Sequence, residues 1–220
     1  MSPLSVKMKT RTLTCISAFL LTMTGLCYPS QAQQEVKVTY ADGALKAKGA
    51  EEQGQKTGVW RYYYPDGTLN AVEQYQNGML HGKIRYYDFE GRLQAVEQWE
   101  QGLQEDSSFY YYPDGKLEKK GVFKKGLYQG EWQFYYDNGQ LKRMGFYQDG
   151  LPAGQWVFYR ESGKLQQQGS YLKGQEHGPW RFYDKKGRLE FTGQYTEGQR
   201  SGQWYYINKR GKKKKIAIEP

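Results

Sequence analysis

The fold is decided by the stretch GEWQFYYDNGQLKRMGFYQDG at residues 130–150, which returns as GQWVFYRESGKLQQQGSYLKG at 154–174 and as GPWRFYDKKGRLEFTGQYTEG at 178–198. The copies lie 24 residues apart without any insertion. Because stacked units must present the same face to each neighbour, this fixed period indicates one repeat array. The turn glycines that keep the period, expected to be structural, are Gly67, Gly91, Gly115, Gly139, Gly163 and Gly187.

Each unit has the composition and turns of two short strands. The chain contains 21 Tyr, 9 Phe, 6 Trp and 27 Gly, which is typical of an all-β protein. Steps such as Asn138-Gly139 and Asp149-Gly150 mark two turns in every unit. The sequence therefore predicts an elongated, twisted, single-layer antiparallel β-meander built from 24-residue hairpin repeats. A β-propeller is the alternative, but seven two-strand units do not divide into four-strand blades.

Two aromatic rows follow from the alternation of side chains along a strand. Trp132 and the aromatic residue two positions later share one face, whereas Tyr135 points to the other. A glycine of the second strand, such as Gly145, leaves a gap where a neighbouring indole could lie, although Glu73 and Glu97 replace it in two units. The Trp row, which we expect to be structural, comprises Trp60, Trp132, Trp156, Trp180 and Trp204.

The tyrosines opposite the Trp row are the candidate binding surface. A tyrosine ring combines a broad apolar face with a polar tip, so a regular row could stack against sugars or bury the side chains of a partner. The same rings could instead stabilise the sheet through cross-strand contacts. The row comprises Tyr63, Tyr87, Tyr111, Tyr135, Tyr159 and Tyr183.

One unit departs from the others. Asp106 stands where the other units have glycine, and Ser108 stands where most have tryptophan. Its apolar face is therefore weaker. Tolerated drift in a single repeat and a notch that binds a partner are both open interpretations.

The first 32 residues follow a different pattern. Three basic residues open the segment, a mostly apolar stretch runs from Leu13 to Leu26, and Ser30-Gln31-Ala32 supplies small residues. This order is typical of a signal peptide cleaved near Ala32, which predicts export to the periplasm or the cell surface. A retained membrane anchor is the alternative, but the apolar stretch is shorter than the roughly 20 residues that a spanning helix needs.

Both cysteines, Cys15 and Cys27, lie in this leading segment. The mature chain is therefore expected to lack disulfides and thiolate sites. Leu26 precedes Cys27 where a lipoprotein signal has a small residue, which argues against a lipid anchor at Cys27. We divide the chain into a signal peptide at 1–32, a repeat array at 33–211 and a basic tail or edge strand at 212–220.

The net charge of +9 is concentrated at the two ends of the chain. Three basic residues lie in the leading segment and six in the run 209–215, so the repeat body is nearly neutral. Nucleic acid is not expected as a partner. The terminal lysines could attract an anionic lipid or polysaccharide, or could protect the last edge strand from pairing with other chains. The candidate contacts are Lys212, Lys213, Lys214 and Lys215.

The patterns G-x-W-x-[FY]-Y and D/N-G-x-L, in phase over roughly residues 40–211, resemble the bacterial variant of the MORN repeat. The resemblance implies an extended sheet that acts as a scaffold or binding surface, without catalytic residues. Many bacterial members carry the label of a YwqK-like antitoxin. An antitoxin against a cytosolic toxin should stay in the cytosol, whereas immunity against a periplasmic toxin is compatible with export.

No constellation of catalytic residues emerges. His81 and His177 are separated by four units, about 40 Å at the usual strand spacing, so they cannot share a metal ion. Adjacent carboxylates such as Glu105 and Asp106 point to opposite faces of a strand. We therefore expect neither an enzyme nor a cofactor or metal site.

The sequence thus predicts an exported, non-enzymatic repeat scaffold that mediates a protein–protein interaction at the cell envelope. The alternatives are a module that binds glycan or anionic lipid, or an antitoxin or immunity protein. The partner's identity, the sheet face used and the oligomeric state stay open.

Overall fold

The computed structural model of the chain describes residues 33–217. The expected signal peptide, its cleavage site near Ala32 and the two cysteines lie outside the described residues. In the described part, no helix is long and apolar enough to cross a membrane.

The described residues form one sheet of 18 strands. The strands are β1 (Gln34–Thr39), β2 (Leu45–Glu52), β3 (Gln55–Tyr63), β4 (Leu69–Gln76), β5 (Met79–Leu80), β6 (Gly82–Tyr87), β7 (Leu93–Glu100), β8 (Leu103–Gln104), β9 (Asp106–Tyr111), β10 (Leu117–Lys124), β11 (Leu127–Tyr135), β12 (Leu141–Gln148), β13 (Leu151–Tyr159), β14 (Leu165–Leu172), β15 (Gln175–Tyr183), β16 (Leu189–Thr196), β17 (Gln199–Ile207) and β18 (Lys213–Ile216).

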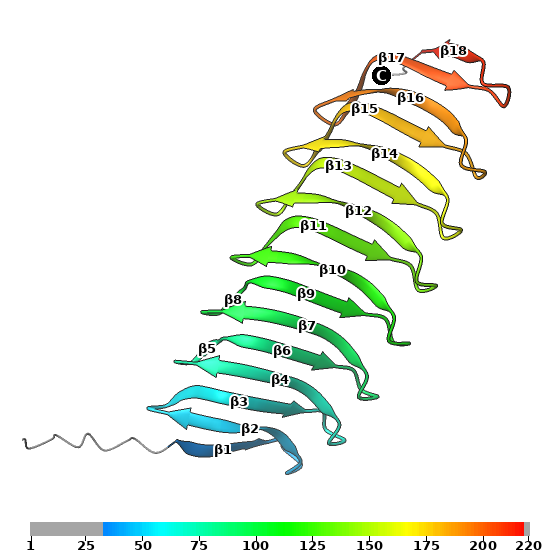
Figure 1. The fold of residues 1–220 in the computed structure, drawn as a ribbon. Coiled ribbons are helices and arrows are strands. Elements are labelled where there is room, and N and C mark those ends of the chain that lie inside the picture. The colour runs from blue at the N-terminus through cyan, green and yellow to red at the C-terminus, as the bar shows by residue number, and fades with distance from the viewer. Residues whose placement is uncertain (1–32, 218–220) are drawn as a thin grey trace, which may run out of the picture. The chain divides into compact units, whose positions relative to one another are not determined.

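The strands pair antiparallel in chain order and form a single layer, and the hairpin turns lie at both ends of the strands (Figure 1). The short β5 and β8 extend this pattern, because β4 pairs with both β5 and β6, and β7 pairs with both β8 and β9. The expected all-β, single-layer antiparallel meander is therefore confirmed.

Two kinds of turn join the strands. At the first, Gly139 has a φ of 82° and donates its N–H to the carbonyl of Tyr136, while the Asn138 side chain accepts the N–H of Gln140. At the second, Asp149 and Gly150 both have positive φ, as the tight type I′ hairpin turn requires. Both turns recur in every full unit, which is why the glycine spacing never varies.

Asp106 keeps the backbone of the glycine that it replaces. Its φ is 65°, and the corresponding Gly58 and Gly130 have φ values of 65° and 67°. Aspartate tolerates this left-handed conformation better than most residues. The loss of glycine therefore leaves the path of the chain unchanged, and the difference in this unit lies in its side chains.

Packing in the single layer rests on indoles laid over glycines. Each of five Trp rings is at most 2% exposed. A Cβ built on the glycine beneath would overlap the ring, so the expected gap is confirmed; the pairs are Gly49 with Trp60, Gly121 with Trp132, Gly145 with Trp156, Gly169 with Trp180 and Gly193 with Trp204. The indole of Trp156 also donates its Nε1–H to the carbonyl of Phe146, 3.1 Å away on the preceding strand. We call this arrangement the Trp–Gly ladder.

A second set of contacts ties each unit to the next. The Tyr136 hydroxyl, just before a turn, donates a hydrogen bond of 2.9 Å to the carbonyl of Tyr159, 23 residues later. Tyr40, Tyr64 and Tyr112 do the same one or more units earlier, and Arg160 does so through its guanidinium. Sequence reasoning did not identify these residues.

The basic segment ends the sheet. Lys213–Ile216 forms β18, which pairs with β17, so part of the expected tail is an edge strand. Lys212, Lys213, Lys214 and Lys215 are all exposed. Lysine on an edge strand hinders pairing with other chains.

Candidate binding hollow

Two consecutive units break the Trp–Gly ladder. Ile84 and Ser108 occupy the positions of the missing indoles, and both are buried. The positions beneath them, glycine in the ladder, are Glu73 and Glu97. Because a Cβ there would overlap an indole, a side chain can occupy this position only where the next unit has no tryptophan. Sequence reasoning recorded the two glutamates and Ser108 as separate irregularities, and the structure shows that they are one change.

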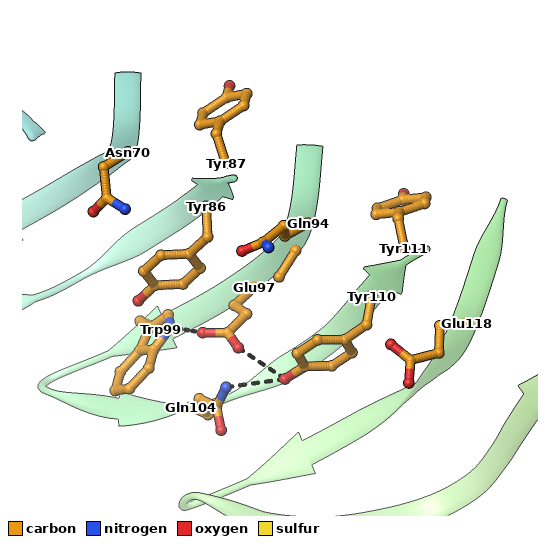
Figure 2. A pocket seen from close by; sticks show the side chains of 11 residues that line it. Asn70, Tyr86, Tyr87, Gln94, Glu97, Trp99, Gln104, Tyr110, Tyr111 and Glu118 are labelled. Atoms are coloured by element: carbon orange, nitrogen blue, oxygen red, sulfur yellow. Dashed lines mark hydrogen bonds between the residues drawn. The ribbon is translucent and has the colours of Figure 1, made fainter. Parts of the chain in front are cut away.

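The change leaves an open hollow of about 530 Å³ over β6, β7 and β9. Figure 2 shows the Glu97 side chain of β7 between Tyr86 of β6 and Tyr110 of β9, with Trp99 of β7 beside Tyr86. Its lining is aromatic and acidic, without any lysine or arginine; the residues are Asn70, Tyr86, Tyr87, Gln94, Ala95, Glu97, Trp99, Gln104, Tyr110, Tyr111 and Glu118.

Glu97 is the central polar group of this hollow. Its side chain is buried, with the residue only 7% exposed. One carboxylate oxygen accepts the Nε1–H of Trp99 at 2.9 Å, and the other accepts the hydroxyl of Tyr110 at 2.8 Å (Figure 2). Gln104 donates from Nε2 to the same hydroxyl at 3.3 Å. These bonds compensate for the desolvation of the carboxylate and fix its orientation.

The pKa values of Tyr86 and Tyr110 are raised above that of an ordinary tyrosine. Burial raises the pKa of Tyr110, and its hydrogen bond to Glu97 raises that pKa further. Burial also raises the pKa of Tyr86, followed by the negative charges of Glu97 and Glu73. Both hydroxyls are therefore neutral groups near the Glu97 carboxylate.

Each tyrosine of the predicted row is the last residue of its strand, and all six are half-buried. Tyr87 and Tyr111 border the hollow, and Figure 2 shows their rings pointing away from Tyr86, Glu97 and Tyr110. Tyr135 donates its hydroxyl to Gln133, which alternates with Trp132 along the strand, so this ring lies on the face opposite the indole. Tyr135 also borders a second depression beside Phe134, whereas Tyr63, Tyr159 and Tyr183 border neither.

The groups at the centre of the hollow were missed by sequence reasoning. Glu97, Tyr86, Trp99 and Tyr110 were not proposed as site residues. One signal was present in the sequence, because the two glutamates that replace ladder glycines each precede a unit without tryptophan. The predicted lysine contacts lie elsewhere, at β18.

The two histidines do not come together. His81 precedes β6 and His177 lies within β15. Within residues 33–217, no group of three or more His, Cys, Asp or Glu side chains is arranged to hold a metal ion.

Comparison with known proteins supports the repeat assignment. The model of the MORN repeat variant family matches residues 56–77, 107–125, 128–149 and 153–173. The matches leave out residues 78–106, which contain Tyr86, Glu97 and Trp99, and also the residues after 173, which contain the ladder residues Trp180 and Trp204. A comparison with curated proteins finds no match.

Similarity to solved structures is slight. TarM matches with 11% identity and a TM-score of 0.30, over 51% of this chain and 19% of TarM. A GtfA/B complex bound to UDP and GlcNAc matches with 14% identity and a TM-score of 0.24, over 52% of this chain and 23% of the other. A porin-like protein from Bacteroides uniformis matches with 8% identity and a TM-score of 0.21, over 82% of this chain and 91% of the other. This chain thus spans about a fifth of the length of the first two.

The units that the family model does not match keep the same 24-residue spacing as the matched ones, and their strands and turns follow the same order. The chain therefore contains repeats of the MORN variant type.

Proposed function

We propose that this repeat scaffold is an exported, non-catalytic protein of the cell envelope that binds another protein through the hollow over β6, β7 and β9. The observation that carries the proposal is the interruption of the Trp–Gly ladder. In the ladder an indole packs over each glycine, whereas the hollow presents aromatic and carboxylate groups to solvent.

The surroundings of the hollow favour a macromolecular partner. Phe89, at the turn between β6 and β7, is 70% exposed and stacks on Tyr64 with ring centroids 4.0 Å apart. At the opposite ends of the strands, Met79, Leu103 and Leu127 are the first residues of β5, β8 and β11 and are 45%, 48% and 50% exposed. Exposed aromatic and aliphatic side chains around a concave site are typical of protein interfaces.

The envelope part of the proposal rests on residues 1–32, whose charge and hydropathy pattern is that of a secretory signal. Export also favours immunity against a periplasmic toxin over neutralisation of a cytosolic one, if the antitoxin label of the family applies. Cell fractionation and N-terminal sequencing test this point. We expect a mature chain that begins near Gln33 in the envelope fraction, and a full-length cytosolic product would contradict export.

Site-specific crosslinking tests the binding surface. Gln94 borders the hollow, and Gln166 occupies the same register position three units later, so a photoreactive benzoylphenylalanine at each gives a matched pair. Irradiation of intact cells is expected to join one defined partner to the Gln94 variant and none to the Gln166 variant. Changing Tyr87 and Tyr111 to Ser should abolish the adduct.

Equal adducts from both positions, or none from either, would refute binding at the hollow. The two tyrosine substitutions must leave the thermal unfolding midpoint near that of the parent variant, since their loss of adduct would otherwise reflect unfolding.

A second candidate function is binding of an anionic glycan or lipid at β18, because all four terminal lysines are exposed. Cosedimentation with vesicles of phosphatidylglycerol tests it. Binding that falls steeply with added salt and is lost when the lysines are changed to Gln would support this function.

A further inference from the structure

We propose that the hollow binds a primary ammonium group, the end of a lysine side chain of the partner, over the ring of Tyr86 and beside the Glu97 carboxylate. This inference rests on the proposed protein-binding function and adds the chemistry of the group that enters the site.

In the next two units, on the same side of the sheet, the chain covers the equivalent ring with a cation of its own; in the units of Phe158 and Phe182 the paired residues are the uncharged Gln167 and Phe191. Lys119 pairs in register with Tyr110 and places its Nζ 4.1 Å from the centroid of that ring. Arg143 pairs with Phe134 and places its guanidinium carbon 4.2 Å from that centroid. The negative face of an aromatic ring attracts such cations.

At Tyr86 the residue in the corresponding register position is Ala95. Its side chain carries no charge and is too short to cover the ring. In residues 33–217, no lysine or arginine lies over Tyr86 in the way that Lys119 lies over Tyr110. Tyr86 therefore has no cation of the chain at its paired position, whereas the equivalent rings of the next two units, Tyr110 and Phe134, have one.

The charge of the lining favours a cation from outside the chain. Glu97 and Glu118 are the charged residues among the lining groups, and both are acidic. The Glu97 carboxylate is held in place by Trp99 and Tyr110. An entering ammonium would gain an attraction to the carboxylate and to the ring together, in a partly desolvated place where both are stronger than in water.

The preceding unit shows the same chemistry occupied by the chain itself. The Nζ of Lys56 lies 4.6 Å from the Trp60 ring and 4.9 Å from the Tyr75 ring, and donates to the Tyr62 hydroxyl at 2.6 Å. Tyr75 in turn donates to Glu73 at 2.7 Å. One period later the place of Lys56 is taken by Leu80, which supplies no charge. The fold thus holds a lysine ammonium among the aromatic rings of one unit, and the next unit has no cation of its own at the equivalent position.

Small-molecule titration of the intact mature protein tests the inference. The probe is Nα-acetyl-lysine methylamide, and its neutral counterpart is Nα-acetyl-norleucine methylamide. The indole N–H signal of Trp99 in a ¹⁵N-labelled sample reports on the site, because this group is bonded to Glu97. We expect a saturable shift with the lysine probe and at least tenfold weaker binding of the norleucine probe.

Two substitutions separate charge from shape. Glu97→Gln should weaken the lysine probe at least tenfold, since it removes the carboxylate charge with little change of volume. Ala95→Lys should abolish binding, because the new side chain places the chain's own ammonium over Tyr86, as Lys119 does over Tyr110. Gln167→Lys, at the same register position three units later, is the matched control and should leave binding unchanged.

Equal shifts with both probes, or full binding by the Ala95→Lys variant with an unchanged unfolding midpoint, would overturn the proposal. Ethanolamine or glucosamine binding tenfold more tightly than the lysine probe would overturn the assignment to a protein lysine. A partner adduct at Gln94 without ammonium binding would refute this inference alone. Ammonium binding without an adduct would refute the protein-binding function alone.

Discussion

The four units from β11 to β17 and the two interrupted units between β4 and β9 share a backbone but differ in their cores. Tyr86 pairs with Ala95 in the interrupted region as Phe134 pairs with Arg143 in the ladder, so the register is the same. In the ladder an indole covers a glycine, whereas in the interrupted region Ile84 or Ser108 replaces the indole and a glutamate replaces the glycine. The sheet is a single layer, so no second sheet covers its face. Whether a unit has its indole therefore decides whether the position beneath is buried core or part of an open binding site.

The largest effect should come from removing an indole of the ladder. Trp156→Ala deletes a ring that is 2% exposed and leaves a cavity over Gly145, which should lower the free energy of unfolding by about 3–5 kcal/mol. Trp99→Ala is the control in the interrupted region, where the indole is half-buried and borders an open hollow, so its cost should be clearly smaller. Chemical denaturation of both variants makes the comparison, and equal costs would show that the two regions do not differ in packing.

The next effect concerns the glycine beneath the indole. Gly145→Ala places a Cβ into the Trp156 ring and should cost about 1–3 kcal/mol. The same substitution in a Trp156→Ile background should cost much less, because the pair then resembles Glu73 with Ile84. A double-mutant cycle by denaturant unfolding measures the coupling. Additive costs would contradict the dependence of glycine on tryptophan.

The reverse change should convert the site back into core. Glu97→Gly together with Ser108→Trp recreates a ladder pair and replaces the Ser108 hydroxyl, which is buried without a hydrogen-bond partner. We expect a gain of about 1–2 kcal/mol from burial of the new ring, and loss of the partner adduct at Gln94. Ser108→Trp alone should destabilise, since the ring would meet the Glu97 side chain. A stable double variant that still binds would remove the hollow from the proposed function.

Much of this fold could be predicted from the sequence, because the 24-residue period fixes strands, turns and register together. The indole lying over glycine followed from Gly145 and its equivalents. The hollow was harder to predict, because Glu97 and Ser108 lie on different strands and each looks like drift when taken alone.

A smaller effect concerns the bonds between units. Tyr136→Phe removes the hydrogen bond to the carbonyl of Tyr159 and should cost about 0.5–1.5 kcal/mol. At the same position in the interrupted region, Asp88 accepts N–H groups of its own turn instead and is bonded to Arg92. Denaturation should therefore show that the Tyr136 variant uncouples neighbouring units, seen as a broader transition, whereas Asp88→Asn does not.

The smallest effect is a difference in titration between the two regions. In the ladder, burial and the nearby Glu176 raise the pKa of Tyr171 to about 12. In the hollow, burial raises the pKa of Tyr110 and the bond to Glu97 adds to the rise. Because both values lie above that of an unfolded tyrosine, near 10, the two groups stabilise the fold fully below pH 10. That contribution is lost as the pH rises through the folded pKa.

Glu97→Gln separates the two causes of these shifts. It should lower the pKa of Tyr110 toward the ordinary value, because the neutral amide no longer opposes a phenolate, and should leave the pKa of Tyr171 unchanged. Carbon-13 chemical shifts of the tyrosine ring carbons between pH 9 and 12.5 measure both groups in one sample. An unaltered titration of Tyr110 would mean that burial alone governs it, and that the Glu97 carboxylate does not set the electrostatic potential in the hollow.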